Sequence, residues 1–480
     1  MKTCTETKKS PKALGGHAIV IGGSLAGMLA ARVLLDHYNE VSILESDCYP
    51  GGPTSRSGVP QSKHVHVLML RGANILEELF SGIRASLVGS DAQLVDMAGD
   101  VDWLTPAGWG LRFPSPLVMI ACTRDLLDWH VRLRLAANPR VKFLESTEVT
   151  GLLRDLSGTQ VTGVHIRSRS QEAPQPEREL RGDLVVDASG RRSKLPQWLV
   201  DIGYEPPPEE MVNGFLGYAS RIYEAPLRDE RTRKIVYIQA APPNITRGGL
   251  VQPIERNRCL VTVLGLGRDY PPVDEDGFLE FARSLRSPHV YDFIRDARPL
   301  SSIAGARNTE NRWRHFEKLK RWPEALVALG DSACAFNPVY GQGMTTAALG
   351  AATLRRLLEH KRQNFERKFQ RELAGVIEAP WMLATSEDFR VRGTEGGSPG
   401  LKTCLMHRYV DHVIRLTTVD RDVRLAFLKV MHMLESPATL FRPSVAMRVI
   451  RQAASCSSRL VGEPVARGTS KDFELGNGVS

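Results

Sequence analysis

Asp331 is the residue of this sequence with the clearest chemical setting. It ends an apolar run, ALVALGD, and a proline, Gly341, Gly343 and the small residues of a helix follow it. A carboxylate at the end of a buried strand can accept hydrogen bonds from hydroxyl groups. Bare backbone at a helix start leaves N–H groups and a positive dipole free for the electron-rich edge of a ligand. The pattern predicts a site for a ligand that has both features.

A second ligand-binding turn is predicted in HAIVIGGSLAGMLAARVLLDHYNEVSILESD, near the N-terminus. The segment has the pattern of an apolar strand, a turn of small residues, an amphipathic helix and a second strand. This is the order of a dinucleotide-binding unit. Gly22 and Gly23 open the turn, and Gly27 lets the helix pack close to the strand. Ser24 replaces the middle glycine and is small enough for a pyrophosphate to approach. Glu45, 18 residues after Gly27, ends the second strand, where a carboxylate can hold ribose hydroxyls.

Two later apolar strands indicate which dinucleotide binds. The segments GDLVVDASGRRSKLPQWL and PEALVALGDSACAF each begin with a strand that can return to the nucleotide-binding sheet. A domain that binds only a nicotinamide dinucleotide does not need these two additional strands. FAD is longer, and its ribitol chain needs a polar partner. Asp331 is predicted to accept a ribitol hydroxyl. Gly341, Gly343 and Met344 are predicted to point N–H groups at the flavin edge that becomes negative on reduction.

Bulk composition limits the class of protein. The chain has 480 residues, of which 42% are hydrophobic and 24% charged, as in ordinary globular proteins. The net charge of +9 comes from scattered basic residues, so nucleic acid is not expected as a partner. The sequence has no apolar signal segment and no stretch that could span a membrane, and its seven cysteines show no metal-ligand spacing. We expect a cytoplasmic protein without a metal ion.

The order of these patterns predicts an α/β fold with a discontinuous, Rossmann-like FAD-binding domain. Residues 15–204 and 321–365 should form this domain. Residues 205–320 alternate apolar and polar positions between turn signals, which predicts an inserted antiparallel sheet that roofs the flavin and binds substrate. Residues 366–462 have helical periodicity and are predicted to form a C-terminal helical region. Residues 463–480 are predicted to be a disordered tail.

Three separated motifs resemble the group A flavoprotein monooxygenases, the para-hydroxybenzoate hydroxylase superfamily. They are GGSLAG, RSGVPQSKHVHVL and GDSACAFNPVYGQGM, and TRDLLDWHVRLRL resembles the family's next helix. The resemblance implies contacts with FAD for five further residues of these segments: Arg56 at the pyrophosphate, Gly58 and Val59 near the flavin, Arg124 beside the FAD chain and Pro338 at the ring.

The segments GVPQSKHVHVLMLRGANILEELF, VVDASGRRSKLPQWL and SACAFNPVYGQGMTTAA are similar to the polyether-type polyene epoxidases, which act on linear polyketides such as the monensin and lasalocid precursors. One departure concerns the superfamily's middle Asp-Gly motif, which is linked to FAD and reduced nicotinamide. The matching pair here is Ser189-Gly190. The electron source therefore stays open between NADPH or NADH used directly and a separate flavin reductase.

The resemblance implies a monooxygenase that inserts one oxygen atom of O2 through a flavin C4a-hydroperoxide, with epoxidation of an alkene in a hydrophobic polyketide or terpenoid intermediate as the expected reaction. An alkene needs no deprotonation, and the sequence has no Ser-His-Asp or paired-carboxylate arrangement that would supply a base. No side chain is therefore assigned to catalytic proton transfer. The residues expected to line the pocket, with packing as the alternative role for each, are His64, His66, Tyr218, Phe336 and Tyr340.

Other reactions remain open at the level of the fold, because one fold hosts many chemistries. Hydroxylation of an aromatic natural product is the alternative within the same class. Prenyl reductases and cyclases share the fold without putting oxygen into the substrate. Flavin-dependent halogenases carry a Trp-x-Trp-x-Ile-Pro stretch, and none of the seven tryptophans here lies in one.

Overall fold

The centre of the protein is a five-stranded parallel sheet, seen in a computed structural model that describes residues 15–169, 176–225, 235–307, 309–360 and 364–461. Every strand of this sheet comes from a segment with a short run of apolar residues. In spatial order they are β19 (Leu326–Ala328), β11 (Leu184–Asp187), β1 (His17–Ile21), β2 (Glu40–Leu44) and β7 (Val141–Leu144). The strands predicted before Ser189 and Asp331 therefore do return to the nucleotide-binding sheet.

Helices pack against this sheet and against one another to form the FAD-domain core. Leu25, Met28 and Leu29 of α1 are almost wholly buried, as are Leu354 of α8 and Phe369 of α9. α8 contacts both α1 and α9. The helices of this layer are α1 (Leu25–Leu34), α2 (Leu70–Leu79), α3 (Ile83–Gly89), α4 (Arg124–Ala136), α5 (Leu195–Asp201), α8 (Gly343–Glu359) and α9 (Phe365–Asp388). α9, placed by the sequence in the C-terminal region, therefore belongs to the FAD-domain core.

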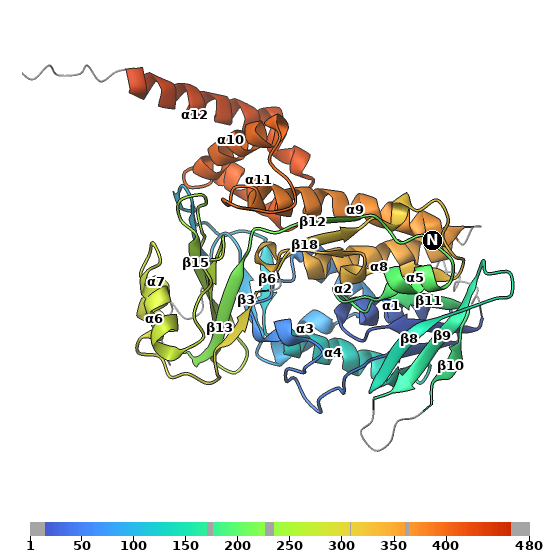
Figure 1. Ribbon diagram of the computed structural model, residues 1–480. Coiled ribbons are helices and arrows are strands. Elements are labelled where there is room, and N and C mark those ends of the chain that lie inside the picture. The colour runs from blue at the N-terminus through green and yellow to red at the C-terminus, as the bar shows by residue number, and fades with distance from the viewer. Residues whose placement is uncertain (1–14, 170–175, 226–234, 308, 361–363, 462–480) are drawn as a thin grey trace, which may run out of the picture.

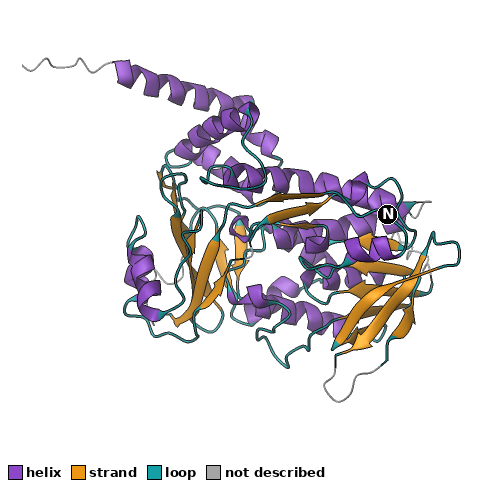
Figure 2. Ribbon diagram, viewed as in Figure 1, coloured by secondary structure: helices purple, strands orange, loops and turns teal. Residues whose placement is uncertain are grey.

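A seven-stranded sheet forms the roof predicted for the inserted domain (Figures 1 and 2). Its order is β17 (Ala304–Ala306), β13 (Gly217–Glu224), β16 (Arg258–Gly265), β15 (Arg247–Ile254), β14 (Ile235–Ile238), β4 (Val101–Thr105) and β5 (Gly108–Trp109). The two last strands come from the segment that the sequence assigned to the FAD domain, so the roof sheet includes strands from outside residues 205–320. β4 pairs in parallel with β14, more than 130 residues away, and such long-range pairing leaves no local signal.

The two faces of the roof sheet have different roles. The face that carries Ala219, Val261 and Val263 packs on two short helices, α6 (Glu275–Arg283) and α7 (His289–Ile294). Tyr218 and Ser220 lie on the other face, which is turned toward the FAD domain. The alternation along β13 therefore presents a defined set of side chains to the candidate site.

The remaining strands form three smaller sheets. β8 (Thr147–Arg154), β9 (Val161–Ser168) and β10 (Arg178–Arg181) form an antiparallel sheet beside the parallel one. β3 (Gln93–Asp96) pairs with β6 (Val118–Ala121). β12 (Glu209–Val212), β18 (Asn311–Arg314) and β20 (Cys334–Ala335) form the third sheet, which ties the two ends of the inserted domain to the chain just after Asp331.

The C-terminal helices α10 (Leu401–Leu416), α11 (Arg421–Met431) and α12 (Pro443–Val461) pack on one end of the roof sheet. Val413, Phe427 and Val445, one from each helix, share an apolar cluster with Trp103 of β4. α12 then runs away from the rest of the molecule (Figure 1). The predicted tail at 463–480 lies outside the described residues. Among the helices that are described, none has the length and apolar character needed to cross a membrane.

Candidate active site

The turn between β1 and α1 has no room for side chains at two of its glycines. A Cβ at Gly27 would collide with the carbonyl oxygen of Gly22, and one at Gly22 would collide with the carbonyl oxygen of Ala188 on the neighbouring strand. Gly22 also has a φ of +96°, which favours glycine. The roles assigned to these glycines from the sequence, a tight turn and close helix packing, agree with this geometry.

The N-terminus of α1 is open to a ligand. Ser24 is the N-cap residue, but its side chain makes no capping hydrogen bond with the described chain. Its Oγ instead accepts a hydrogen bond of 3.0 Å from Nη2 of Arg124, whose Nε donates to Asp128 at 2.7 Å. The first N–H groups of α1 are thus left for an anionic group such as a pyrophosphate, with the Arg124 guanidinium beside them.

Glu45 is buried next to this turn and is already engaged. Its Oε2 accepts a hydrogen bond from the N–H of Gly23 at 3.1 Å and lies 3.0 Å from Nη2 of Arg56. Tyr49, which the sequence analysis missed, donates to the carbonyl oxygen of Gly23 at 2.9 Å. Arg56 therefore balances the charge of Glu45. An open hollow of about 370 Å³, lined by Gly23, Tyr49 and Arg56 among others, adjoins them where the adenosine half of a dinucleotide could lie.

Two neighbours of Arg56 face the protein rather than an open space. The N–H of Gly58 donates to Oδ2 of Asp47 at 2.6 Å, and the side chain of Val59 is buried. Both residues were predicted to lie near the flavin. Their contacts hold the segment after β2 against Asp47, and the segment positions Arg56.

The carboxylate of Asp331 stands at the end of β19 beside the start of α8. A Cβ built on Gly343 would lie 3.9 Å from Oδ1 of Asp331. Within the described chain this carboxylate accepts no hydrogen bond. Burial raises its pKa, and the positive charges of Arg191, Arg124 and Arg314 oppose that rise. A carboxylate in this condition is an acceptor for ligand hydroxyls, as the sequence predicted for the ribitol chain.

The backbone at the start of α8 is also open to the close approach of a ligand. The 3-10 turn Pro338–Tyr340 leads to Gly341, whose φ is +66°, and then to the N-cap residue Gln342. No side chain of the described residues caps α8. Met344, in the first turn, lines the hollow described below. Free N–H groups at this N-terminus and the nearby Asp331 reproduce the pair of features that the sequence pattern predicted.

A buried carboxylate, Asp388, holds the turn that precedes α8. Its Oδ2 accepts from Nδ2 of Asn311 at 2.6 Å, and its Oδ1 accepts from Nδ2 of Asn337 at 2.9 Å and from the Tyr340 hydroxyl at 3.0 Å. Asn337 in turn accepts a hydrogen bond from the N–H of Val339. Burial raises the pKa of Asp388 to about 6. The last residue of α9 thus fixes both ends of the Pro338–Tyr340 turn.

His64 joins the segment after β2 to the roof sheet. Its Nδ1 lies 2.8 Å from the Oγ of Ser220, and its ring packs edge-on against Tyr218 with centroids 4.3 Å apart. Burial lowers the pKa of His64 to about 4 and raises that of Tyr218 to about 12. Both side chains are therefore neutral near pH 7. Tyr218 and Val339 also pack against the same apolar cluster, so roof and turn meet through uncharged groups.

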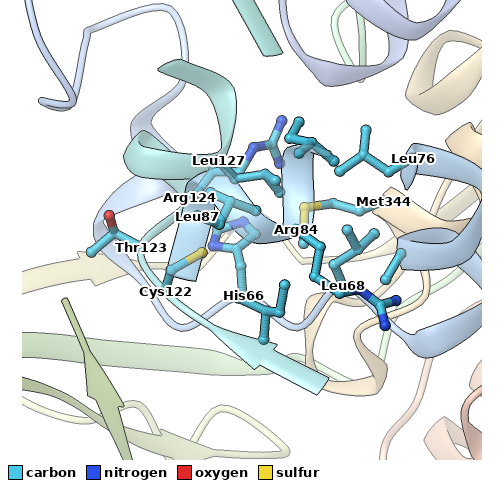
Figure 3. A pocket seen from close by; sticks show the side chains of 13 residues that line it. His66, Leu68, Leu76, Arg84, Leu87, Cys122, Thr123, Arg124, Leu127 and Met344 are labelled. Carbon is cyan, nitrogen blue, oxygen red and sulfur yellow. The ribbon is translucent and has the colours of Figure 1, made fainter. Parts of the chain in front are cut away.

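His66 lines an open hollow of about 490 Å³ between the two turns (Figure 3). Arg124 and Met344 border the same hollow, and most of the remaining lining is leucine and isoleucine. The Nδ1 of His66 lies 2.9 Å from the carbonyl oxygen of His64. Burial, together with the nearby Arg124, lowers the pKa of His66 to about 3. This histidine therefore contributes an uncharged wall.

The comparisons with known proteins agree with this geometry. Residues 18–192 match the sequence profile of the family described as FAD dependent oxidoreductase. The chain is also 32% identical over 376 residues to Protein Rv3254 of Mycobacterium tuberculosis, a match that covers 76% of this chain and 79% of the relative. The chain belongs to the FAD-dependent oxidoreductases.

Solved structures share the fold of this oxidoreductase. The flavin-dependent brominase Bmp2 superposes with a TM-score of 0.65 at 13% identity, over 93% of this chain and 100% of that one. A flavoprotein/dehydrogenase from Cytophaga hutchinsonii gives 0.64 at 15% identity, over 94% and 100%. The probable FAD-dependent monooxygenase pqsL from Pseudomonas aeruginosa gives 0.55 at 18%, over 78% and 97%. At these identities the likeness supports the fold of the oxidoreductase and not its reaction.

Two residues predicted to wall the pocket of the oxidoreductase also have contacts within the protein. Phe336 is 6% exposed and belongs to the FAD-domain core. Tyr340 directs its hydroxyl to Asp388, as described above. Arg191 is half-buried and donates to the carbonyl oxygen of Phe336 at 3.0 Å. Tyr340 and Arg191 thus stabilise the Pro338–Tyr340 turn of the oxidoreductase through hydrogen bonds within the protein.

The Ser189-Gly190 pair also has a structural explanation. The hydroxyl of Ser189 donates to Oδ1 of Asp187 at 2.6 Å, and the N–H of Gly190 donates to the Oγ of Ser332 at 2.9 Å. The side chain of Ser189 is thus turned toward the end of β11. This contact favours neither direct use of NADPH or NADH nor a separate flavin reductase as the electron source of the oxidoreductase.

Proposed function

We propose that this oxidoreductase is an FAD-dependent monooxygenase that transfers one oxygen atom from O2 to an alkene of a hydrophobic polyketide or terpenoid intermediate. The epoxidase resemblance of the segments around His64, Ser189 and Pro338 motivates the substrate class. The proposal takes NADPH or NADH as the electron source, either directly or through a separate flavin reductase.

The residues of the site fit FAD. The open N-terminus of α1 and Arg124 suit the pyrophosphate, Glu45 suits the ribose, and the unpartnered carboxylate of Asp331 suits a ribitol hydroxyl. The N–H groups at the start of α8 suit the electron-rich edge of the flavin ring. When bound, FAD supplies the activation of O2 that no amino-acid side chain provides.

The observation that carries the proposal is the uncharged contact between the roof sheet and the turn at Pro338–Tyr340. His64 and His66 have lowered pKa values and their Nδ1 atoms already engaged, and Tyr218 shares an apolar cluster with Val339. These uncharged groups and the leucine and isoleucine side chains beside His66 present an apolar surface that limits water, with Arg84 and Arg124 at the border of the hollow. An oxygen-transfer site needs that dryness, because water and protons divert activated oxygen to peroxide.

Aromatic hydroxylation is the second candidate, and one observation favours it. The sequence showed no arrangement that could supply a base, whereas the structure places the buried carboxylate of Asp388 in hydrogen-bond contact with the Tyr340 hydroxyl. With a pKa of about 6, Asp388 is ionised near pH 7 and could take a phenol proton through Tyr340. An alkene substrate would not need this route.

The test is product analysis with labelled dioxygen. Purified enzyme loaded with FAD is given NADPH, or a flavin reductase with NADH, together with linear polyenes or with phenols. We expect one labelled oxygen atom in the polyene product, as an epoxide. Label in a hydroxylated phenol and none in any polyene would favour the second candidate, and the Asp388→Asn variant should then lose that activity. Unlabelled saturated, cyclised or halogenated products would replace both candidates by a reductase, a cyclase or a halogenase.

A further inference from the structure

Arg424, on α11, is the most deeply buried arginine of the described chain, and it lies outside the FAD-domain site. Its side chain has no exposed surface. The guanidinium lies over the ring of Trp103, with Cζ 5.3 Å from the ring centroid. Its Nε, Nη1 and Nη2 atoms all lack a hydrogen-bond partner among the described residues.

The other buried arginines each have an acidic partner. Arg124 pairs with Asp128 at 2.7 Å, Arg221 with Glu275 at 2.7 Å, and Arg314 with Glu209 at 3.0 Å. No acidic group acts on Arg424, and burial alone lowers its pKa to about 10. It therefore remains charged at neutral pH. A buried charge without a partner costs several kcal/mol, so the fold retains it against a large penalty.

The surroundings of Arg424 lead toward the flavin-side turn. The rings of Trp103 and Tyr237 lie 5.5 Å apart, and Tyr237 is close enough to Tyr340 for the two phenols to interact electrostatically. These aromatic side chains come from β4 and β14, at the end of the roof sheet that α11 covers. Trp103 and Tyr237 thus lie on the side of Arg424 that leads to the turn beside Asp331, where the carboxylate of Glu387 acts on both Tyr237 and Tyr340.

The backbone of Gly110, which is partly exposed, covers the Arg424 guanidinium on one side. A Cβ at Gly110 would collide with Nη1 of Arg424, so the backbone lies directly on the guanidinium. The segment Gly110–Pro116 has no regular secondary structure, and the N–H of Leu111 fastens it to the carbonyl oxygen of Thr417 at 3.0 Å. A movement of this segment would open the way to the charge.

We propose that Arg424 binds the carboxylate of an otherwise apolar substrate whose chain extends along Trp103 and Tyr237 toward Tyr340. This inference rests on the proposed function for the position of the reacting end, and it adds that the substrate is a long-chain carboxylic acid. A carboxylate matches the planar fork of a guanidinium and would supply the partner that Arg424 lacks among the residues that the structure describes.

The experiment compares two probes of equal tail length, dodecanoate and dodecanol, by calorimetric titration of FAD-loaded protein at pH 7.5. Wild type should bind dodecanoate about 10- to 100-fold more tightly than dodecanol, as for one charge-assisted pair. Arg424→Met should lose that preference. Arg415→Met, which changes an exposed arginine on α10, should keep it. Sodium acetate and inorganic phosphate, titrated alone, test whether a small anion suffices.

A second measurement separates ligand binding from a structural role. If Arg424 has no partner within the protein, Arg424→Met should have a higher Tm than wild type in the absence of probe. Dodecanoate should then raise the Tm of wild type more than that of the variant.

Three results would overturn the inference. Equal binding of dodecanoate and dodecanol by wild type would do so, even if Arg424→Met failed to fold. A dodecanoate preference retained by Arg424→Met would do so, and so would phosphate binding as tightly as dodecanoate. None of these measurements depends on oxygen transfer, so failure of the monooxygenase proposal would be seen separately in the labelled-dioxygen experiment.

Discussion

The turn after β1 and the turn after β19 both leave a helix N-terminus open to a ligand, yet different parts of the chain hold them. In the first turn, Gly22, Gly27 and Glu45 lie within 24 consecutive residues. Gly27 packs on Gly22 and Glu45 accepts from Gly23, and Ala188 of the neighbouring strand packs on Gly22. In the second, Asn311 and Asp388, from β18 and the end of α9, fix the backbone around Pro338. The first turn is therefore set by local steric fit, and the second by a buried polar network that assembles only in the folded chain.

Gly27→Ala is expected to have the largest effect, because it breaks the first turn itself. The new Cβ meets the backbone carbonyl of Gly22, which cannot rotate away as a side chain could. We expect FAD binding to be lost and the free energy of unfolding to fall by about 1–3 kcal/mol or more. Denaturant unfolding and FAD titration measure both. The control is Gly375→Ala in α9, where a Cβ meets nothing within 4 Å; it should leave FAD affinity unchanged.

Asp331→Ala removes the acceptor of the second turn while leaving its backbone in place. A hydrogen bond from a ribitol hydroxyl to a carboxylate contributes roughly 1.5–3 kcal/mol, so FAD affinity should fall by about one to two orders of magnitude. Asp331→Asn, which keeps a neutral acceptor, should lie between wild type and Asp331→Ala. Titration of folded apoprotein with FAD is the measurement, and unchanged affinity in Asp331→Ala would mean that the ribitol lies elsewhere.

The network of the second turn should also appear as a pH dependence of the free energy of unfolding. Burial raises the pKa of Asp388 to about 6, above its ordinary value of 3.8 in an unfolded chain. The folded state thus binds the proton more tightly, and this contribution to stability is full below pH 4 and is lost as pH rises through 6. The loss is about 3 kcal/mol at most. Denaturant unfolding between pH 4 and 7 should show a shallower slope in Asp388→Asn. Parallel curves would mean that Asp388 is ionised throughout.

Asp388→Asn should weaken FAD binding modestly at pH 7.5. The asparagine amide replaces one acceptor by a donor, which opposes the donors from Asn311, Asn337 and Tyr340. The loss of one such bond is about 0.5–1.5 kcal/mol, or roughly a 2- to 10-fold weaker affinity. Glu378→Gln, an exposed residue of the same helix α9, is the matched control. If both variants bound FAD alike, the turn would not depend on Asp388.

His66→Leu should have the smallest effect on FAD binding, because His66 lies between the two turns and holds neither. We expect FAD affinity within about threefold of wild type. Coupling should change instead, since a different shape in the wall admits water or misplaces substrate, so hydrogen peroxide should rise as product falls. Oxygen uptake, peroxide and product measured together test this. Complete loss of product at unchanged flavin reduction would make His66 a catalytic residue.

The sequence by itself determined the parts that depend on neighbours along the chain. The strand His17–Ile21, the glycine turn with Glu45, and the placement of Asp331 before Gly343 follow from residue types at fixed short spacings, and the structure has each of them. The short helices on the roof were predictable for the same reason, since an amphipathic period is a local property.

The tertiary structure alone decided the contacts between distant segments. Asp388 lies 51 residues from Asn337 and 77 from Asn311. Their hydrogen bonds therefore could not be predicted from the spacing of these residues in the sequence. β4 and β5 join a roof sheet formed mainly by residues more than 100 positions later, and Phe336, close to the flavin motif in sequence, packs into the core. In the sequence RDVRLAFLKVM, Arg424 resembles a surface arginine. The packing of α11 on Trp103 buries its charge and leaves it without a hydrogen-bond partner among the described residues.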